Sequence, residues 1–394
     1  MTSRIYYTDP SCRRFEAVVI RTLQHDGRPA AVLDRTAFYP TSGGQPFDVG
    51  SLAERHGSSP ATVRVVDTID ADDEIVHVLS EPIATGVAVT GEVDWARRFD
   101  HMQQHTGQHV LSASFDRLFD NRTVSFHMGA DLSTIDLQKE LSWEQIARVE
   151  DEANRVVSEN RDVAIRFVSA HEAATLPLRK EPARDGVLRL IDIEDVDLSA
   201  CGGTHVARTG AVGVIVVPAI ERFKGGLRVT FACGKRAVRV FRTLRGAVGG
   251  SVHALSVHPQ ELPAAIVRMQ TEAKDLRRSM KKLQESLAAH EAVRLVAPTV
   301  VDALDGWDAV GLKMIASEIT SRTSAVVALF STSSPTAVVI ARSADRGNRR
   351  RDRAVDAAAR AQGAHEQSHG GRDRCRRRRL VRGAARRAGD PARR

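Results

Sequence analysis

The run HTGQHVLSASFDRLF, residues 105–119, decides how the middle of this chain folds. It begins with His105 and His109, and the apolar residues that follow recur at steps of three and four, which predicts one face of an α-helix. Residues four apart on a helix are stacked neighbours, so both imidazoles can reach a single ion. The run therefore predicts a helix that carries half of a metal site.

A second run, CGGTH at residues 201–205, repeats the spacing of four with Cys201 and His205. Its two glycines argue against a helix and favour a tight loop that turns both side chains the same way. One thiolate and three imidazoles form a ligand set that suits Zn²⁺, which takes nitrogen and sulfur donors in a tetrahedron. Either pair alone is explained as well by surface or core residues, but the two pairs together predict one zinc site.

The composition is typical of a globular chain. With 394 residues, 42% hydrophobic and 27% charged, it has room for two or three domains. It has neither a run of eighteen apolar residues nor an apolar segment near the N-terminus, so we expect a cytoplasmic protein without a membrane span. Four dispersed cysteines do not form a disulfide framework, and we expect Cys12 and Cys233 to be structural.

The net charge of +8 comes from the C-terminal end. Residues 346–394 hold seventeen Arg and five acidic residues, a net charge of +12, so the rest of the chain carries −4. Any nucleic-acid surface on the body of the chain must then be a local basic patch. Residues 347–394 are nearly all Arg, Ala and Gly, which predicts disorder. We interpret them as the out-of-frame end of a gene from a GC-rich genome, with a nucleic-acid-binding tail as the alternative.

Hydrophobic patterning divides the rest of the chain. Residues 1–94 contain short β-branched runs separated by turn-forming residues, which predicts a small β-barrel. Residues 95–248 alternate helices and strands without a dinucleotide fingerprint, which favours an α+β domain with an antiparallel sheet and a last helix ending near residue 245. Within this domain, Ser142 and Gln145 have the spacing of a capping box and predict a helix start.

A long helix is predicted in residues 258–296. Apolar residues at 262–287 follow an alternating spacing of four and three for about four heptads, with largely charged residues between them. This pattern predicts a coiled coil, as a hairpin arm or a homodimer contact, and a single amphipathic helix packed on a domain is the alternative. Residues 297–346 then predict a small α/β module.

Several of these stretches together resemble the AlaX family of free-standing alanyl-tRNA editing proteins, long type, which is similar to the editing and C-terminal parts of alanyl-tRNA synthetase. The matching stretches are LDRTAFYPTSGGQPFDVG (33–50), MQQHTGQHVLSASF (102–115), TVSFHMGADLSTIDL (123–137), LPLRK (176–180) and DLSACGGTHVARTGAVG (197–213). Their order and spacing agree with the family over roughly residues 5–248. Residues 307–345 resemble the start of the DHH-associated domain that closes such proteins, whereas the Arg-rich sequence after them departs from the family.

The resemblance implies zinc-dependent hydrolysis of mischarged tRNA(Ala) carrying serine, with glycine as a second wrong amino acid. A small apolar pocket cannot strongly reject an isostere that adds a hydroxyl, so a second, hydrolytic site is needed. No ATP-dependent catalytic core precedes the barrel in this sequence, so we expect hydrolysis in trans. Four protein ligands are typical of a closed structural zinc, whereas a catalytic zinc keeps one position open. A zinc-stabilised tRNA-binding module without activity is therefore the alternative.

The resemblance also implies a substrate pocket. Its residues would be Thr36, Gly43, Gly44, Ser125, His127 and Gly203. For Ser125 a plain strand position is the alternative, and each glycine of the loop is also explained by a turn that needs glycine backbone angles. Gly203 would leave room for substrate next to the metal ligands.

Overall fold

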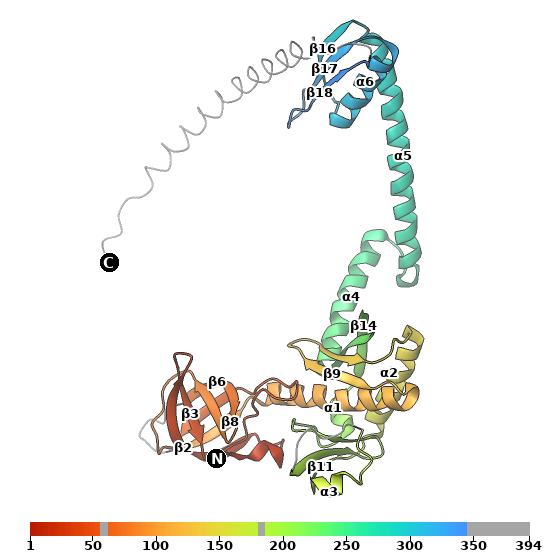
Figure 1. Cartoon of the computed structure of the whole chain (residues 1–394). Coiled ribbons are helices and arrows are strands. Elements are labelled where there is room, and N and C mark those ends of the chain that lie inside the picture. Colours follow the sequence, from red (N-terminus) through yellow and green to blue (C-terminus); the bar gives the residue numbers. More distant parts are fainter. Residues whose placement is uncertain (56–61, 180–185, 345–394) are drawn as a thin grey trace, which may run out of the picture. The chain divides into compact units, whose positions relative to one another are not determined.

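The computed structural model describes residues 1–55, 62–179 and 186–344. They fall into two compact units, Met1–Ser251 and a second that begins at Val252 (Figure 1). Lys180 of the LPLRK run and the Arg-rich tail, residues 347–394, lie outside the described residues. Among the helices of the described part, none is long and apolar enough to cross a bilayer.

A closed antiparallel barrel forms the start of the first unit, as the sequence predicts. Its six strands follow one another around the barrel in the order β2 (Arg14–His25), β3 (Arg28–Leu33), β7 (Glu74–Leu79), β6 (Thr62–Ala71), β5 (Gly50–Glu54) and β8 (Ala88–Val93). Its interior is apolar, with Phe15, Leu52 and Val65 among its buried residues. Beside it, β1 (Ser3–Arg4) pairs in parallel with β4 (Arg35–Thr36), and η1 (Ile5–Tyr7) is a 3₁₀ turn.

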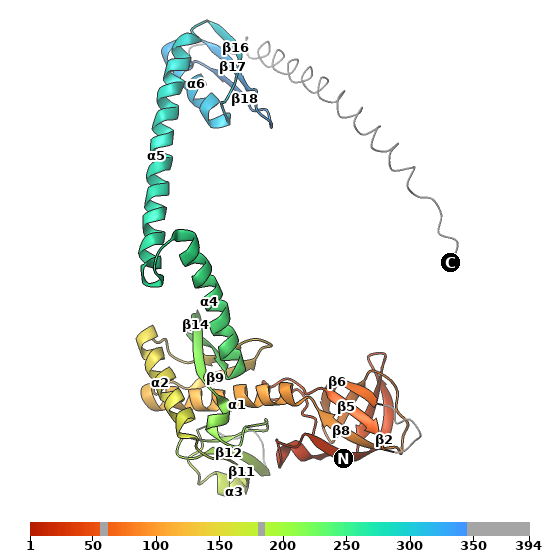
Figure 2. The same ribbon diagram turned by 180° about the vertical axis from the view of Figure 1, so that it is seen from behind.

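Helix α1 (Trp95–Phe119) begins where the barrel ends, and the Asp94 side chain caps it by accepting from the Arg97 N–H. The helix runs between two antiparallel sheets (Figures 1 and 2). One sheet has the order β14 (Ile215–Phe223), β15 (Gly226–Cys233), β10 (Ser133–Leu137), β9 (Thr123–Met128), and the other β11 (Val163–Ser169), β12 (Val187–Ile193), β13 (Asp197–Ala200). This arrangement confirms the α+β class with antiparallel sheets.

Helix α2 (Trp143–Glu159) packs on α1 and confirms the predicted capping box. The Ser142 hydroxyl accepts from the Gln145 N–H, and the Gln145 side chain accepts from the Ser142 N–H, so two N–H groups of the first turn are satisfied. The inward face of α2 joins the core of the unit. Two short pieces complete this region, α3 (Ala170–Ala173) and η2 (Thr209–Val212).

Helix α4 (Lys235–Leu255) is longer than the sequence predicts. The expected end near residue 245 was wrong, because Gly246, Gly249 and Gly250 continue the helix instead of ending it. A glycine costs about 1 kcal/mol in a helix, but unlike proline it removes no backbone hydrogen bond.

The second unit contains η3 (Pro259–Glu261), the 33-residue α5 (Leu262–Arg294) and a small α/β module. In the module β16 (Thr299–Leu304) pairs in parallel with β17 (Val326–Ser331), β18 (Val338–Arg342) pairs antiparallel with β17, and α6 (Ala309–Arg322) packs against them. Most of the predicted seam of α5 is exposed, including Leu276 and Leu283 at 63% and 65%. Pairing of this helix into a coiled coil therefore stays a prediction.

Candidate metal centre

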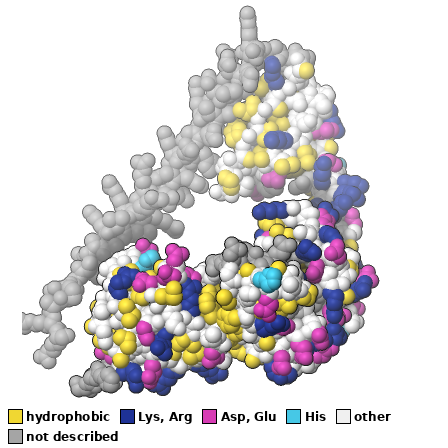
Figure 3. Space-filling model, turned by 60° about the horizontal axis from the view of Figure 1, so that its bottom comes forward, with side chains coloured by type: hydrophobic (Ala, Val, Ile, Leu, Met, Phe, Trp, Pro, Cys, Tyr) yellow, Lys and Arg dark blue, Asp and Glu magenta, His cyan; other side chains and the backbone are white. Residues whose placement is uncertain are grey.

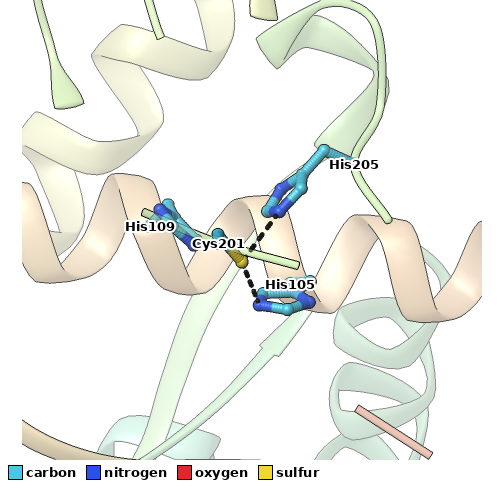
Figure 4. A group of neighbouring side chains, drawn as sticks. All are labelled: His105, His109, Cys201 and His205. Atoms are coloured by element: carbon cyan, nitrogen blue, oxygen red, sulfur yellow. Dashed lines mark hydrogen bonds between the residues drawn. The ribbon is translucent and has the colours of Figure 1, made fainter. Parts of the chain in front are cut away.

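Four side chains from two distant segments converge beside α1 (Figure 4). His105 and His109 lie one turn apart on the helix, and Cys201 and His205 come from an irregular loop, as predicted. Their ligand atoms all lie within 4.8 Å of one another. The Cys201 Sγ is 3.4 Å from Nε2 of both His105 and His205.

These distances suit a tetrahedral ion. With a Zn–S bond of about 2.3 Å and Zn–N bonds of about 2.0–2.1 Å, neighbouring ligand atoms are separated by about 3.3–3.6 Å. The two measured Sγ–Nε2 distances fall in that range, while the widest spacing in the group would contract as the ligands close on an ion. The donor set and its spacing therefore fit zinc.

Each imidazole is held through its other nitrogen, and for His105 and His109 the partner also sets the tautomer. Nδ1 of His105 lies 2.9 Å from the Gln45 Oε1, and Nδ1 of His109 lies 2.6 Å from the Asp197 Oδ2. Both acceptors require a proton on Nδ1, so Nε2 is left as the ligand atom. For the third ring, Nδ1 of His205 is 3.2 Å from the Thr106 hydroxyl, which can donate or accept, so this contact orients the ring without assigning its proton.

Gln45 ties the barrel loop to the cluster. It is fully buried, and its Oε1 also accepts from the Thr204 N–H, while its Nε2 donates to the Thr204 hydroxyl. The turn before it, from Ser42, places Gly43 and Gly44 at φ +57° and +82°. Glycine adopts such angles more readily than residues with a Cβ, so both glycines favour the turn that brings Gln45 to His105.

Asp197 is the anionic support of the cluster. It is almost fully buried, and the Arg179 guanidinium donates to both of its oxygens. Burial would raise the pKa of Asp197, but the bonds from His109 and Arg179 hold it below its usual range. Burial lowers the pKa of His109, and the bond to Asp197 together with Cys201 outweighs this effect and raises it to about 9.

The electrostatics also favour a thiolate. Burial would raise the pKa of the Cys201 thiol, but the charges of His105 and His205 and the hydrogen bonds to it lower the pKa well below its usual value. The Gly203 N–H also donates to this sulfur at 3.4 Å. A thiolate is the form that ligates metals.

Two glycines of the motifs are explained by close packing. A Cβ on Gly203 would lie 2.1 Å from the Cε1 of His105, and a Cβ on Gly107 would lie 2.3 Å from the Cys233 Sγ. Both distances are far below a van der Waals contact. The space at Gly203 is therefore filled by the ligand ring, and its predicted role in substrate binding stays a prediction.

The other predicted substrate residues are spread around the cluster. On β9, Phe126 packs against the His105 ring with centroids 5.4 Å apart, so Ser125 and His127 face away from it and are exposed. The Ser125 hydroxyl donates to Asp136 on β10. The Thr36 hydroxyl lies inside the barrel, 2.8 Å from Nε2 of His77.

Three residues that contact the histidines of the cluster were not predicted from the sequence: Gln45, Asp197 and Thr106. Each lies inside a motif that the sequence singles out, the glycine-rich loop, the run before CGGTH and HTGQH itself. Ligating histidines almost always donate a hydrogen bond from their second nitrogen. Polar residues within the same motifs could therefore have been predicted as the partners of these nitrogens.

Known proteins match two parts of this architecture. Residues 15–97 match the family described as tRNA synthetases class II (A), and residues 188–228 match the threonyl and alanyl tRNA synthetase second additional domain. The chain is 36% identical to the alanine–tRNA ligase of Pyrococcus furiosus over 73% of its own length and 32% of the ligase. It thus spans about a third of the length of such ligases.

A second relative is matched over most of its length. The alanyl-tRNA editing protein AlaX-L of Pyrococcus horikoshii is 31% identical over 346 residues, which are 84% of this chain and 84% of that protein. The barrel, the His/Cys cluster and the two family matches together define an alanyl-tRNA synthetase-like protein. The chain belongs to the AlaX family of alanyl-tRNA editing proteins.

Proposed function

We propose that this chain hydrolyses the ester bond of Ser-tRNA(Ala), with Gly-tRNA(Ala) as a second substrate, at the cluster of His105, His109, Cys201 and His205 holding Zn²⁺. The observation that carries the proposal is the convergence of three Nε2 atoms and one sulfur, with every imidazole fixed by its own partner. Membership of an editing family supports the reaction class.

The chain's own residues prepare the site for this reaction. A bound zinc ion would supply a Lewis acid for the ester carbonyl or lower the pKa of a water molecule. Gln45, Asp197 and Thr106 contact the Nδ1 atoms of the three rings, which leaves the Nε2 atoms to hold the ion. Phe126 beside His105 presents an apolar wall, which strengthens the electrostatic interactions next to it.

Selection of serine over alanine requires a polar group near the amino acid. A site that hydrogen-bonds the serine hydroxyl rejects alanine, because alanine leaves that group unpaired. We keep Thr36, Gly43, Gly44, Ser125, His127 and Gly203 as proposed substrate residues. Of these, Gly43 and Gly44 belong to the loop that delivers Gln45 to the cluster, which supports them most directly.

The second candidate function is tRNA binding by a zinc-stabilised module without catalysis. Four protein ligands favour it, because such a set closes the coordination sphere. In that case the metal would stabilise the fold and no ester would be cut. Catalysis instead requires one ligand to yield its position to substrate or water.

A deacylation assay with His105→Ala tests the proposal. The parent should release serine from Ser-tRNA(Ala) and spare Ala-tRNA(Ala), and the variant should lose at least about 100-fold in rate, the scale of removing one essential transition-state interaction. His171→Ala, an exposed histidine of α3 in the same unit, is the matched control and should keep the parent rate.

Three measurements separate the outcomes. Metal analysis of the parent should find one zinc per chain. Equal rates for the parent and His105→Ala would refute catalysis at the cluster. A parent that binds tRNA and unfolds on chelation, yet cuts no ester at any pH, would establish the second candidate instead.

We also propose that residues 262–287 pair two copies of the chain. The seam of α5 is exposed and keeps the heptad spacing, which supports pairing. Light scattering should report a dimer for the parent and a monomer for Leu276→Lys with Leu283→Lys. A monomeric parent would remove this proposal.

A further inference from the structure

A basic pocket lies between the first turns of α1 and α4, outside the metal cluster. Its volume is about 720 Å³, and its wall includes the side chains of Arg97, His101, Lys235, Arg236, Arg239 and Arg242. Five of the twelve lining residues are Lys or Arg, and one, Asp100, is a carboxylate. On the face drawn in Figure 3 basic and acidic side chains are intermixed over much of the surface.

The carboxylate does not neutralise the pocket. Asp100 accepts from two nitrogens of Arg236, whose third nitrogen donates to the Gly129 carbonyl, so this partly buried pair is internally satisfied. Arg239 lies 3.8 Å from Asp131, and both side chains are exposed, which makes the pair weak. Within the described residues, Lys235 and Arg242 have no ion-pair partner and face solvent.

The start of α4 adds to this field. The helix begins at Lys235 and runs for 21 residues with no acidic residue in its first turn. The first four N–H groups of a helix have no partner within it, and its dipole favours a negative charge at this end. The pocket thus combines free cations with a helix N-terminus, an arrangement suited to phosphate.

His101 points independently to a ligand. The residue is only 4% exposed, and its Nδ1 has no hydrogen-bond partner among the described residues. Burial and the neighbouring Arg97 lower its pKa to about 3, so the ring is neutral and offers one donor and one acceptor. A buried nitrogen without a partner is costly. Nδ1 itself has almost no exposed surface, so a bound group would contact the part of the His101 ring that lines the pocket.

The pocket is close to the cluster along two segments. His101 precedes His105 by four residues on α1, about one helical turn or 6 Å. Pro46, in the pocket wall, directly follows Gln45, the partner of His105. A strand of RNA whose 3′-terminal ester reached the cluster would therefore bring its last phosphates to this pocket.

We propose that the pocket of Lys235, Arg239, Arg242 and His101 binds backbone phosphates at the single-stranded 3′ end of an aminoacylated RNA. The proposal rests on the proposed function, because that function brings such an RNA end to the cluster. Lysine and arginine supply the charge, the α4 N–H groups supply donors, and His101 makes a hydrogen bond to phosphate or ribose.

The test measures binding of deacylated tRNA(Ala) by the full, metal-loaded chain, as anisotropy over a range of salt concentrations. Lys235→Ala with Arg242→Ala should weaken binding at least tenfold at low salt. It should also reduce the slope of log Kd against log salt by about 1.5, because two phosphates are no longer neutralised by the protein. Arg245→Ala is the matched control, since Arg245 follows on the same helix outside the pocket wall and should leave the slope unchanged.

A second variant separates a ligand-binding role of His101 from a structural one. His101→Leu removes a buried nitrogen that has no partner among the described residues, so the Tm should be kept or raised while RNA affinity falls several-fold. A fall in Tm with unchanged affinity would show a structural role and count against the pocket.

The outcomes also distinguish this proposal from the editing reaction. Deacylated RNA has no ester, so a parent that binds it through the pocket but cuts no Ser-tRNA(Ala) refutes the reaction and supports the pocket. Identical affinity and salt slope for the double variant and Arg245→Ala, or a parent that does not bind the RNA, would overturn the pocket.

Discussion

The barrel interior and helix α1 are both buried, but they bury opposite kinds of side chain. The barrel encloses apolar residues, and its rare polar ones, such as Thr36 and His77, are bonded to each other. In α1 every residue from His101 to Phe115 is buried, and most of them are polar. Burying a polar group costs free energy unless it gains a partner, so a helix of this kind persists because its surroundings supply partners.

Those partners come from every side of α1. Gln104 donates to the carbonyl of Cys233 and accepts from its N–H, and Gln103 donates to the Ala211 carbonyl. The two histidines of the cluster complete the series. The barrel is therefore stabilised by the amount of apolar area it buries, whereas α1 is stabilised by specific contacts, and this difference sets α1 apart from the barrel.

Of the changes considered, removal of the metal should have the largest effect on the stability of α1 relative to that of the barrel. Chelation leaves three imidazoles and a thiolate buried together without an ion, so we expect at least about a 5 °C fall in Tm and loss of deacylation, both restored by zinc. Hydrogen exchange should show α1 losing protection while β2 and β8 of the barrel keep theirs. Equal loss in both regions would contradict the distinction between them.

Asp48→Ala tests the junction of the two regions. Asp48 accepts from Arg98 of α1, and both side chains are fully buried. The variant leaves the Arg98 guanidinium buried and without its counter-charge, so the free energy of unfolding should fall by about 3–5 kcal/mol in urea titration. Asp192→Ala, which breaks the half-exposed pair with Arg166, is the control and should cost about 1 kcal/mol or less.

His77 gives the barrel a pH dependence of known sign. Burial lowers its pKa to about 4, below the value of about 6.5 in the unfolded chain, so the folded state binds fewer protons between these values. The free energy of unfolding is therefore undiminished by His77 above pH 6.5, and it falls by up to about 3 kcal/mol as the pH drops to 4. His77→Gln should flatten this part of the stability profile, and an unchanged slope would show that other groups cause it.

Gly107→Ala should have the smallest effect. The added Cβ would meet the Cys233 sulfur, and overpacking of this kind costs about 1–3 kcal/mol in unfolding experiments. The double variant with Cys233→Ala should recover part of the loss, which a double-mutant cycle measures. Gly246→Ala on α4 has open space around the new Cβ, so it should be neutral or stabilising by up to about 1 kcal/mol.

Local patterns predicted the parts that depend on neighbouring residues. Helix α2 starts at its capping box, the barrel strands appear at their β-branched runs, and HTGQH lies on a helix. No β-branched run predicts β5, which has only five residues and one fully buried side chain, Leu52. The end of α4 was missed because glycines weaken a helix without stopping it.

The sequence by itself determined the class of fold, most of the order of the elements and the four residues that converge at the cluster, because these follow from spacing along the chain. Only the tertiary structure decided that Gln45, Asp197 and Thr106 orient the rings, that α1 is buried on all sides and that an arginine-lined pocket adjoins the cluster. The reason is that these contacts join residues about 60 to 100 positions apart, and such pairs leave no periodicity to detect.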